Sequence, residues 1–168
     1  MLIRPEQPGD WLAVHHVNES AFDGHVEVDL VDTLRQQVPD LVSLVAEHDG
    51  SIVGHILFSP VTLSNHPDLR IMGLAPMAVT PPHQRSGIGT ALVNAGVERC
   101  RELGFGAVAV LGHAQYYPRF GFRPAKRFGI GCEYDVPDEV FMLLELRPGF
   151  LTGASGIIKY HDLFQNTA

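Results

Sequence analysis

The sequence predicts a single domain of the α/β (α+β) class, in which helices flank a mixed central sheet. Its 168 residues fit one compact domain, and 45% of them are hydrophobic, which suffices for a substantial core. Short apolar segments typical of strands alternate with longer segments whose apolar residues recur at helical spacing. This alternation, without internal repeats or low-complexity segments, is typical of domains that layer helices on a sheet. We therefore expect residues 1–168 to form one domain.

The N-terminal part contains one expected strand and two expected helices. Leu2–Arg4 alternates like a strand, and Asp10 is placed to cap the helix that follows. The apolar residues of that helix recur at helical spacing: Trp11, Val14, Val17 and Ala21. A second helix is predicted over residues 26–37, where Val28, Val31 and Leu34 recur every third residue, and Pro39 ends it.

Three strands are expected in the middle of the chain. Residues 41–46 and 52–58 flank the turn signal Asp49-Gly50, so they predict a hairpin. The next strand, over 70–79, contains Pro76, which cannot donate a ladder hydrogen bond and so marks an edge or a bulge.

A long helix, a buried strand and a last strand complete the expected order. The helix covers residues 87–103 and ends at Gly104, and residues 106–111 are fully apolar, as a central strand should be. The helix face expected toward the sheet consists of Ile88, Ala91, Leu92, Ala95 and Leu103. Residues 140–146 predict another strand, after a loop that contains Gly129 and before a Gly-rich tail.

Bulk properties limit the classes of partner and compartment. A formal net charge of −7 argues against nucleic acid or an anionic membrane as the main partner. Two cysteines are too few for a disulfide framework, so a reducing cytoplasm is expected. No run of eighteen apolar residues occurs, and the first residues read as a strand without a signal-peptide core. The nine histidines show no metal-ligand spacing, so we expect no metal site.

The most informative stretch runs from Met77 to Thr90, where a strand leads into a Gly-rich turn and a helix. Small residues let backbone N–H groups approach an anion, and the helix start adds its positive dipole end. No acidic residue lies between Leu69 and Val97 to repel an anion. A dinucleotide-binding turn is excluded because Leu92 stands at its third Gly position, and no Lys supports a nucleotide-triphosphate loop. A tight turn without a ligand is the alternative.

A second block, Val108 to Phe122, reads as a buried strand, a short helix and a turn. Gln84-Arg-Ser-Gly-Ile-Gly89 matches the Gln/Arg-x-x-Gly-x-Gly/Ala signature of the GNAT superfamily of acyl-CoA-dependent N-acyltransferases, and Tyr117, Gly121 and Phe122 resemble its Tyr-x-x-x-Gly-Phe ending. The resemblance covers about residues 1–147, which leaves 148–168 as a C-terminal extension. It implies the GNAT fold: a mixed, mostly antiparallel central sheet with splayed parallel strands 4 and 5, flanked by helices.

The resemblance also implies a coenzyme site. The pantetheine arm would bond to the backbone of Met77, Ala78 and Val79, and an N–H near Val79 would polarise the thioester carbonyl. The residues expected around the pyrophosphate are Gln84, Arg85, Ser86, Gly87, Ile88, Gly89 and Thr90. His113 and Tyr117 complete the expected coenzyme contacts, and Tyr117 is the matching residue for the general acid. Alternatively, Tyr117 packs beside the coenzyme and only orients it.

The general base is where the sequence departs from the family pattern, because Gly73 stands where some members carry Glu. Glu27, expected to border the acceptor, His113, and a water relay to Asp135 are the candidates. An acceptor with a low-pKa amine would need no dedicated base. The acids on the second helix slightly favour a cationic amine.

The expected function is N-acetyl transfer from acetyl-CoA to a primary amine of a small molecule or peptide, by direct attack in a ternary complex. The expected partners are acetyl-CoA and the amine acceptor, with no metal, nucleic acid or membrane; exposed strands of this fold also often pair across homodimers. Two other hypotheses remain: a sensor module that binds acyl-CoA without turnover, and a phosphate-binding α/β domain unrelated to CoA.

Overall fold

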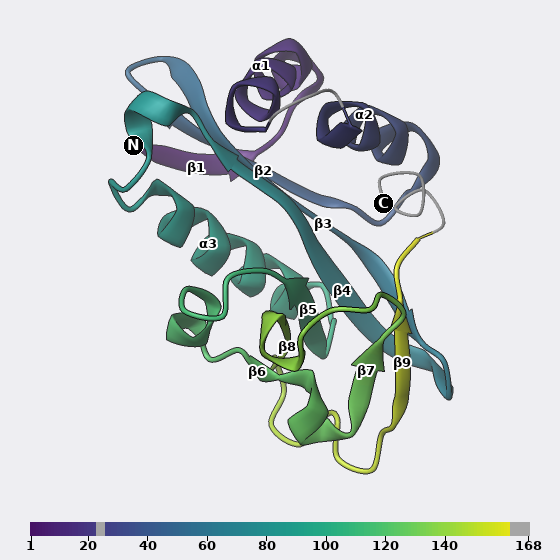
Figure 1. Cartoon of the computed structure of the whole chain (residues 1–168). Helices are drawn as coiled ribbons and strands as arrows, with labels where there is room; N and C mark the ends of the chain where they lie inside the picture. The colour runs from purple at the N-terminus through teal and green to yellow at the C-terminus, as the bar shows by residue number, and fades with distance from the viewer. Residues whose placement is uncertain (23–25, 162–168) are drawn as a thin grey trace. The chain divides into compact units, whose positions relative to one another are not determined.

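The expected order of helices and strands is present in the computed structural model of the chain (Figure 1). The structure describes residues 1–22 and 26–161, with the side chains of 26–28 left outside the description. These residues form two compact units: residues 1–59 with 75–99, and residues 60–74 with 100–161. We call them unit 1 and unit 2 and describe each by itself.

Unit 1 contains the N-terminal strands and helices. Its elements are β1 (Leu2–Pro5), α1 (Trp11–Ala21), α2 (Val26–Gln37), β2 (Val42–His48), the first part of β3 (Ser51–Leu63), the last part of β4 (His66–Val79) and most of α3 (Ile88–Glu102). The strands pair in the order β1-β2-β3-β4, and the first two pairs are antiparallel. Asp49 and Gly50 adopt positive φ angles of 52° and 80° between β2 and β3, which confirms the predicted hairpin turn.

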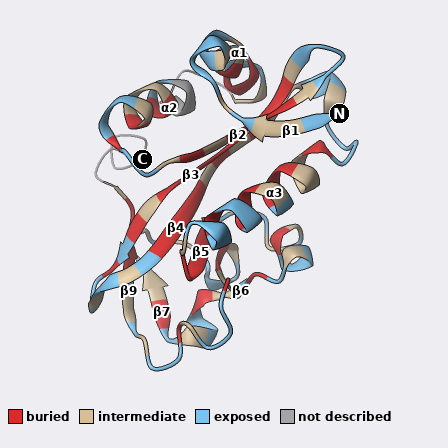
Figure 2. Cartoon of the chain, turned by 180° about the vertical axis from the view of Figure 1, so that it is seen from behind, coloured by how far each residue is buried: buried red, intermediate tan, exposed pale blue. Residues whose placement is uncertain are grey.

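The two faces of β3 in unit 1 carry different helices. A Cβ added at Gly54 would lie 3.0 Å from side-chain atoms of both Ile88 and Leu92, so α3 packs directly on the backbone there. The next residue, His55, contacts Asn18 of α1 on the opposite face. In both views α1 and α2 cover one face of these strands, and α3 covers the other (Figures 1 and 2).

The start of α1 differs from the prediction. Asp10 makes no side-chain capping bond to α1. Its carboxylate instead accepts hydrogen bonds from the backbone N–H of Gln7 at 2.8 Å and from Nη1 of Arg4 at 2.7 Å. The prediction of a cap was wrong because a short 3-10 helix, Pro8–Asp10, precedes α1, and the carboxylate of Asp10 caps the start of that helix instead.

Unit 2 contains the mixed part of the sheet. Its strands pair in the order β3-β4-β5-β8-β6, where β5 is Ala107–Leu111, β8 is Phe141–Glu145 and β6 is Arg123–Pro124. β4 and β5 are parallel, whereas β5 and β8 are antiparallel. The pairing of β4 with β5 ends at Leu74 and Val110, ahead of Pro76, although β4 continues to Val79. This arrangement confirms the predicted fold class.

Three strands of unit 2 were not predicted: β7, β9 and the two-residue β6. β7 (Ile130–Cys132) and β9 (Gly156–Lys159) lie side by side and parallel, and β9 also pairs with Thr62 and Leu63 of β3 (Figure 1). They fall in the segments that the sequence analysis assigned to a loop and a Gly-rich tail.

Helix α3 ends as predicted, with one exception. Gly104 has a φ of 90°, and the N–H of Phe105 bonds to the carbonyl of Cys100 at 3.1 Å, as in a left-handed C-terminal cap. Leu103, expected on the face toward the sheet, is 38% exposed, because it lies beyond the last helical residue. The central strand is buried as expected over Ala107–Val110 (Figure 2).

Candidate active site

The Gly-rich turn of unit 1 has a backbone shaped for an anion. It follows a 3-10 helix, Pro81–His83, and passes through two left-handed residues, Arg85 with φ 61° and Gly87 with φ 90°, before α3 begins. The hydroxyl of Ser86 donates to the carbonyl of His83. The turn is thereby fixed by its own hydrogen bonds while the residues 84–87 stay exposed.

The N–H groups at the start of α3 point out of the helix. The first helical bond runs from the N–H of Ala91 to the carbonyl of Gly87 at 3.0 Å. Within the described part of the chain, the N–H groups of Gly87, Ile88 and Gly89 have no acceptor. Nothing lies within 4 Å of a Cβ built on Gly87, so a ligand can approach this backbone. Unpaired N–H groups at the positive end of a helix suit a phosphate.

The end of β4 leads directly into this turn. Gln84 Nε2 donates to the carbonyl of Val79 at 2.9 Å, so Gln84 ties the turn to the strand. Ala78 is buried, whereas Met77 and Val79 are half-buried. All three residues lie beyond the part of β4 that pairs with β5, which leaves that edge of their backbone without a strand partner.

In unit 2, Tyr117 begins a 3-10 helix, Tyr117–Phe120, and is only 7% exposed. A Cβ added at Gly112 would overlap atom Cε2 of Tyr117, so the edge of the phenol ring lies directly against this glycine. Tyr116 and Phe122 make edge contacts with the ring, at centroid distances of 5.1 and 5.6 Å.

Burial raises the pKa of Tyr117 to about 12, with a smaller contribution from the neighbouring Tyr116. The phenol therefore keeps its proton at neutral pH, which suits a group that donates a proton or a hydrogen bond.

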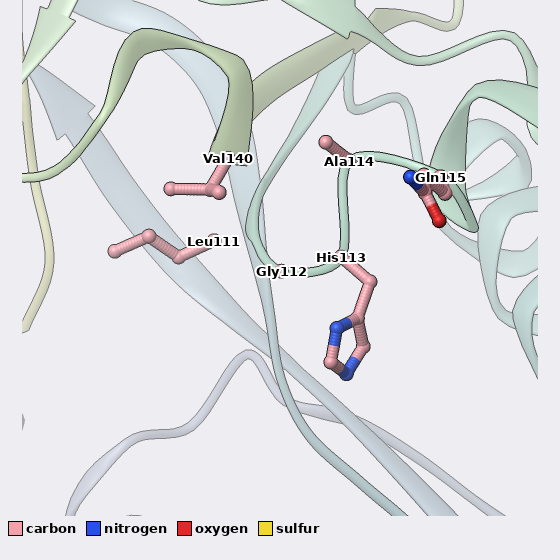
Figure 3. Close-up of a pocket in the computed structure, with 6 residues that line it drawn as sticks. All are labelled: Leu111, Gly112, His113, Ala114, Gln115 and Val140. Carbon is pink, nitrogen blue, oxygen red and sulfur yellow. The ribbon is translucent and has the colours of Figure 1, made fainter.

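His113, expected to contact the coenzyme, does not belong to the short helix Tyr117–Phe120. It lies four residues earlier, in a turn where its carbonyl accepts from the N–H of Tyr117 at 3.3 Å. Its imidazole is exposed beside a pocket of about 490 Å³ at the end of β5 (Figure 3). The pocket is lined by Leu111, Gly112, His113, Ala114, Gln115 and Val140.

A family model for the acetyltransferase (GNAT) family matches residues 11–122, a range that includes the turn, the end of β4 and Tyr117. The chain belongs to the GNAT acetyltransferase family. Its reaction class is N-acetyl transfer.

Relatives of this GNAT protein match along nearly the whole chain. The N-acetyltransferase YhbS of Escherichia coli K12 is 33% identical over 165 residues, which are 98% of this chain and 98% of YhbS. The crystal structure of Escherichia coli YhbS in complex with CoA has a TM-score of 0.92, with 98% of this chain and 91% of that chain covered, at 32% identity. A GNAT acetyltransferase from Brucella melitensis in complex with acetyl-CoA has a TM-score of 0.79 at 32% identity, with 97% of each chain covered.

The absence of a carboxylate at the family's base position has a structural reason. A Cβ at Gly73 would lie 2.8 Å from Val61 Cγ1 and 2.9 Å from Tyr160 Cε1. The ring of Tyr160, which follows β9, therefore takes the space that a Glu side chain would need. Any replacement at Gly73 must displace one of these two side chains.

The other candidates for a base lie apart in the chain and differ in their surroundings. The backbone of Glu27 belongs to α2, but its side chain lies outside the described residues. In unit 2, Asp135 lines a second, smaller pocket of about 210 Å³, where Lys126 and Asp138 form an ion pair at 3.6 Å.

Sequence reasoning missed two residues that shape this part of the GNAT domain. Gly112 makes room for the Tyr117 ring, and Val140 closes the pocket beside Leu111. The dipeptide Leu111-Gly112, an apolar residue and a glycine at the end of a buried strand, was the available signal. In residues 1–22 and 26–161, no group of three His, Cys, Asp or Glu is placed to hold a metal ion, and no helix could cross a membrane.

Proposed function

We propose that the chain transfers the acetyl group of acetyl-CoA to a primary amine by direct attack in a ternary complex. The amine nitrogen attacks the thioester carbonyl carbon, and the resulting tetrahedral intermediate expels the CoA thiolate. The nitrogen loses one proton, and the thiolate gains one. The observation that carries the proposal is the set of N–H groups without acceptors at the start of α3, in a chain whose relatives bind CoA and acetyl-CoA.

The pyrophosphate of the coenzyme is assigned to the turn. The N–H groups from Arg85 to Thr90 would hold it, with the guanidinium of Arg85 adding a charge-assisted bond and Gln84 keeping the turn in place. The backbone of Met77, Ala78 and Val79 would pair with the amides of the pantetheine arm, and an N–H near Val79 would stabilise the oxyanion. His113 is proposed as a further contact of the coenzyme.

Tyr117 is proposed as the general acid for the departing thiolate. Its phenol is protonated at neutral pH because burial raises its pKa to about 12. No single base is proposed, because an alkyl amine with a pKa of ~10.4 can enter the active site as the small fraction that is neutral at pH 7. Glu27, His113 and a water relay to Asp135 remain the candidates for helping that step.

The experiment is a measurement of free-thiol release and CoA affinity in Tyr117→Phe. We expect kcat to fall by roughly 10²-fold or more, the usual contribution of a general acid, while the Kd for CoA changes less than about threefold. Tyr116→Phe is the matched control, since it removes the neighbouring hydroxyl and keeps its ring. An unchanged kcat in Tyr117→Phe would remove this residue from the mechanism.

A sensor module that binds acyl-CoA without turnover is the second candidate. It is favoured by Gly73, where packing against Val61 and Tyr160 leaves no room for the carboxylate of the family pattern. Saturable CoA binding, combined with no thiol release across a broad panel of amines and peptides, would support it.

The remaining proposals concern the compartment, the partners and the domain boundaries of the chain. The chain is proposed to act in the cytoplasm, consistent with Cys100 and Cys132, which form no disulfide among the described residues. Its proposed partners are acetyl-CoA, an amine acceptor and, through an exposed strand, a second copy of the chain, with no nucleic acid or membrane partner. One N-acetyltransferase domain over residues 1–168, with its core in 1–147, remains a proposal.

A further inference from the structure

The residues that line the pocket at the end of β5 are uncharged and mostly apolar, so they favour some ligands over others. Leu111, Ala114 and Val140 give it three apolar side chains, while His113 and Gln115 add one imidazole and one amide. No Asp, Glu, Lys or Arg is among its lining residues. A polycation held in a protein pocket needs carboxylates to replace its water, so this lining does not suit one. It suits an uncharged, mostly apolar group.

Leu111 is exposed, although the other residues of its strand are buried. The four preceding residues of β5, Ala107–Val110, are at most 1% exposed, whereas Leu111 is 37% exposed. Figure 3 shows the side chains of Leu111 and Val140 lying close together at the pocket, with the imidazole of His113 extending away from them. The N–H of Gly112 bonds to the carbonyl of Val140 at 2.9 Å, which fixes the two walls relative to each other. The apolar surface is thus preformed.

The pocket also begins beside the proposed general acid. Gly112 is one of its lining residues, and the ring of Tyr117 lies against the same glycine. His113, the next lining residue, holds the N–H of Tyr117 through its carbonyl at 3.3 Å. A molecule that occupies this pocket therefore reaches the neighbourhood of the phenol, where the thioester sulfur is proposed to be.

We propose that this pocket binds the apolar part of the acceptor, so that the acceptor is a primary amine carried by an aromatic or aliphatic group. This inference rests on the proposed function and names the substrate class of the same site. It excludes polyamines and aminoglycosides as preferred acceptors and replaces the weak preference for a cationic acceptor that the acidic residues of the second helix suggested. Because Leu111, His113 and Gln115 are all exposed, the pocket is open to a ligand that arrives from solution.

The test compares acceptors and matched variants. Thiol release is measured with 2-phenylethylamine and hexylamine against putrescine, spermidine and kanamycin, in the wild type and in Leu111→Asn. Leu103→Asn and Ile157→Asn are the controls, because these residues are 38% and 39% exposed and lie outside the pocket. We expect the apolar amines to have the higher kcat/KM. Leu111→Asn should raise their KM roughly three- to tenfold, with the KM for acetyl-CoA unchanged.

Three results would overturn the proposal. The first is a higher kcat/KM for the polycations than for the apolar amines, and the second is an equal effect of Leu111→Asn and the two control variants. The third is that Leu111→Asn changes only the KM of the acyl donor, acetyl-CoA or butyryl-CoA. The last result would assign the pocket to the coenzyme or its acyl chain. If no amine is turned over, the proposed function fails separately, and calorimetry decides about the pocket. Binding of 2-phenylethylamine to the CoA-loaded chain, lost in Leu111→Asn and kept in Ile157→Asn, would then support it, and absence of binding would refute it.

Discussion

At the scale of single residues, the position of Tyr117 depends on a neighbour without a side chain. Gly112 has no positive φ angle, so its backbone conformation does not require glycine. Glycine is required here because the Tyr117 ring occupies the place that a Cβ would take. Tyr116 and Phe122 hold the same ring from its edges. We infer that Gly112 positions the phenol.

Gly112→Ala should therefore lower kcat through Tyr117. A methyl group at residue 112 displaces the ring, and a misplaced catalytic group costs on the order of 10- to 100-fold in rate. The decisive measurement is kcat of Gly112→Ala in the wild-type and Tyr117→Phe backgrounds. If Gly112 acts by positioning the hydroxyl, the alanine has little effect once the hydroxyl is absent. An equal loss in both backgrounds would show a general structural role instead.

At the scale of elements, a buried polar network holds α1 and α2 onto the strands of unit 1. Asn18 Nδ2 lies 3.1 Å from His55 Nδ1, and Ser43 Oγ lies 2.9 Å from His55 Nε2. The hydroxyl of Ser43 donates to Glu6 Oε2, and Glu6 accepts from Nε of Arg35 on α2 at 2.8 Å. Since Asn18 Nδ2 can only donate, His55 is neutral with its proton on Nε2. The donors from α1 and from α2 thus converge on the carboxylate of Glu6, which only accepts.

The stability of the chain should depend on pH through His55. Complete burial, followed by the charge of Arg35, lowers the pKa of His55 from 6.5 to about 3. Between these two values the unfolded chain binds a proton that the folded chain does not, so folding stability falls as the pH falls. Between pH 7 and pH 5 we expect His55 to account for a loss of about 2 kcal/mol in the free energy of unfolding.

Denaturant unfolding at these two pH values checks this prediction, with His55→Gln as the reference that cannot titrate. The wild type should lose more stability than His55→Gln on acidification, even if the variant is less stable at pH 7. Equal losses in the two proteins would mean that His55 does not carry the pH dependence.

The elements differ in how far the sequence could predict them. The helix over 26–37 and the Asp49-Gly50 hairpin follow from local patterns, namely helical spacing and a turn dipeptide, and both were confirmed. β7 and β9 have three and four residues, and their order comes from pairing with each other and with Leu63, which lies far away in sequence. No local pattern encodes such a pairing.

The same limit applies to the candidate site. The turn from Gln84 to Gly89 and Tyr117 could be found because short motifs carry them. The pocket could not, because Val140 meets Leu111 only after β8 pairs with β5. Gly73 was noticed as a missing carboxylate, but its reason, the ring of Tyr160, required the structure.

At the scale of the whole molecule, residues 148–161 are integrated into unit 2. The ring of Phe150 fills the place of a Cβ at Gly106, next to β5, and the ring of Tyr160 does the same at Gly73 on β4. β9 adds backbone bonds to β3. Both central strands of unit 2 therefore pack against residues that follow position 147.

Deletion of residues 148–168 should consequently destabilise the chain. Loss of the half-buried ring of Phe150, the buried ring of Tyr160 and a strand is expected to remove roughly 3–5 kcal/mol or more, as for the truncation of a single large aromatic core residue. Thermal unfolding of the truncated and complete chains measures this, with a truncation after His161 as the control. An unchanged midpoint in the chain that ends at residue 147 would show that the segment is a dispensable extension.

The most direct test of acetyl transfer is the stoichiometry of the two products. The chain is incubated with acetyl-CoA and 2-phenylethylamine, free thiol is measured optically, and the N-acetylated amine is measured by mass spectrometry. One acetylated amine for each thiol released, with no release when the amine is omitted, is the predicted result. Thiol release without an acetylated amine, for any acceptor in the panel, would show hydrolysis of the thioester and would contradict transfer.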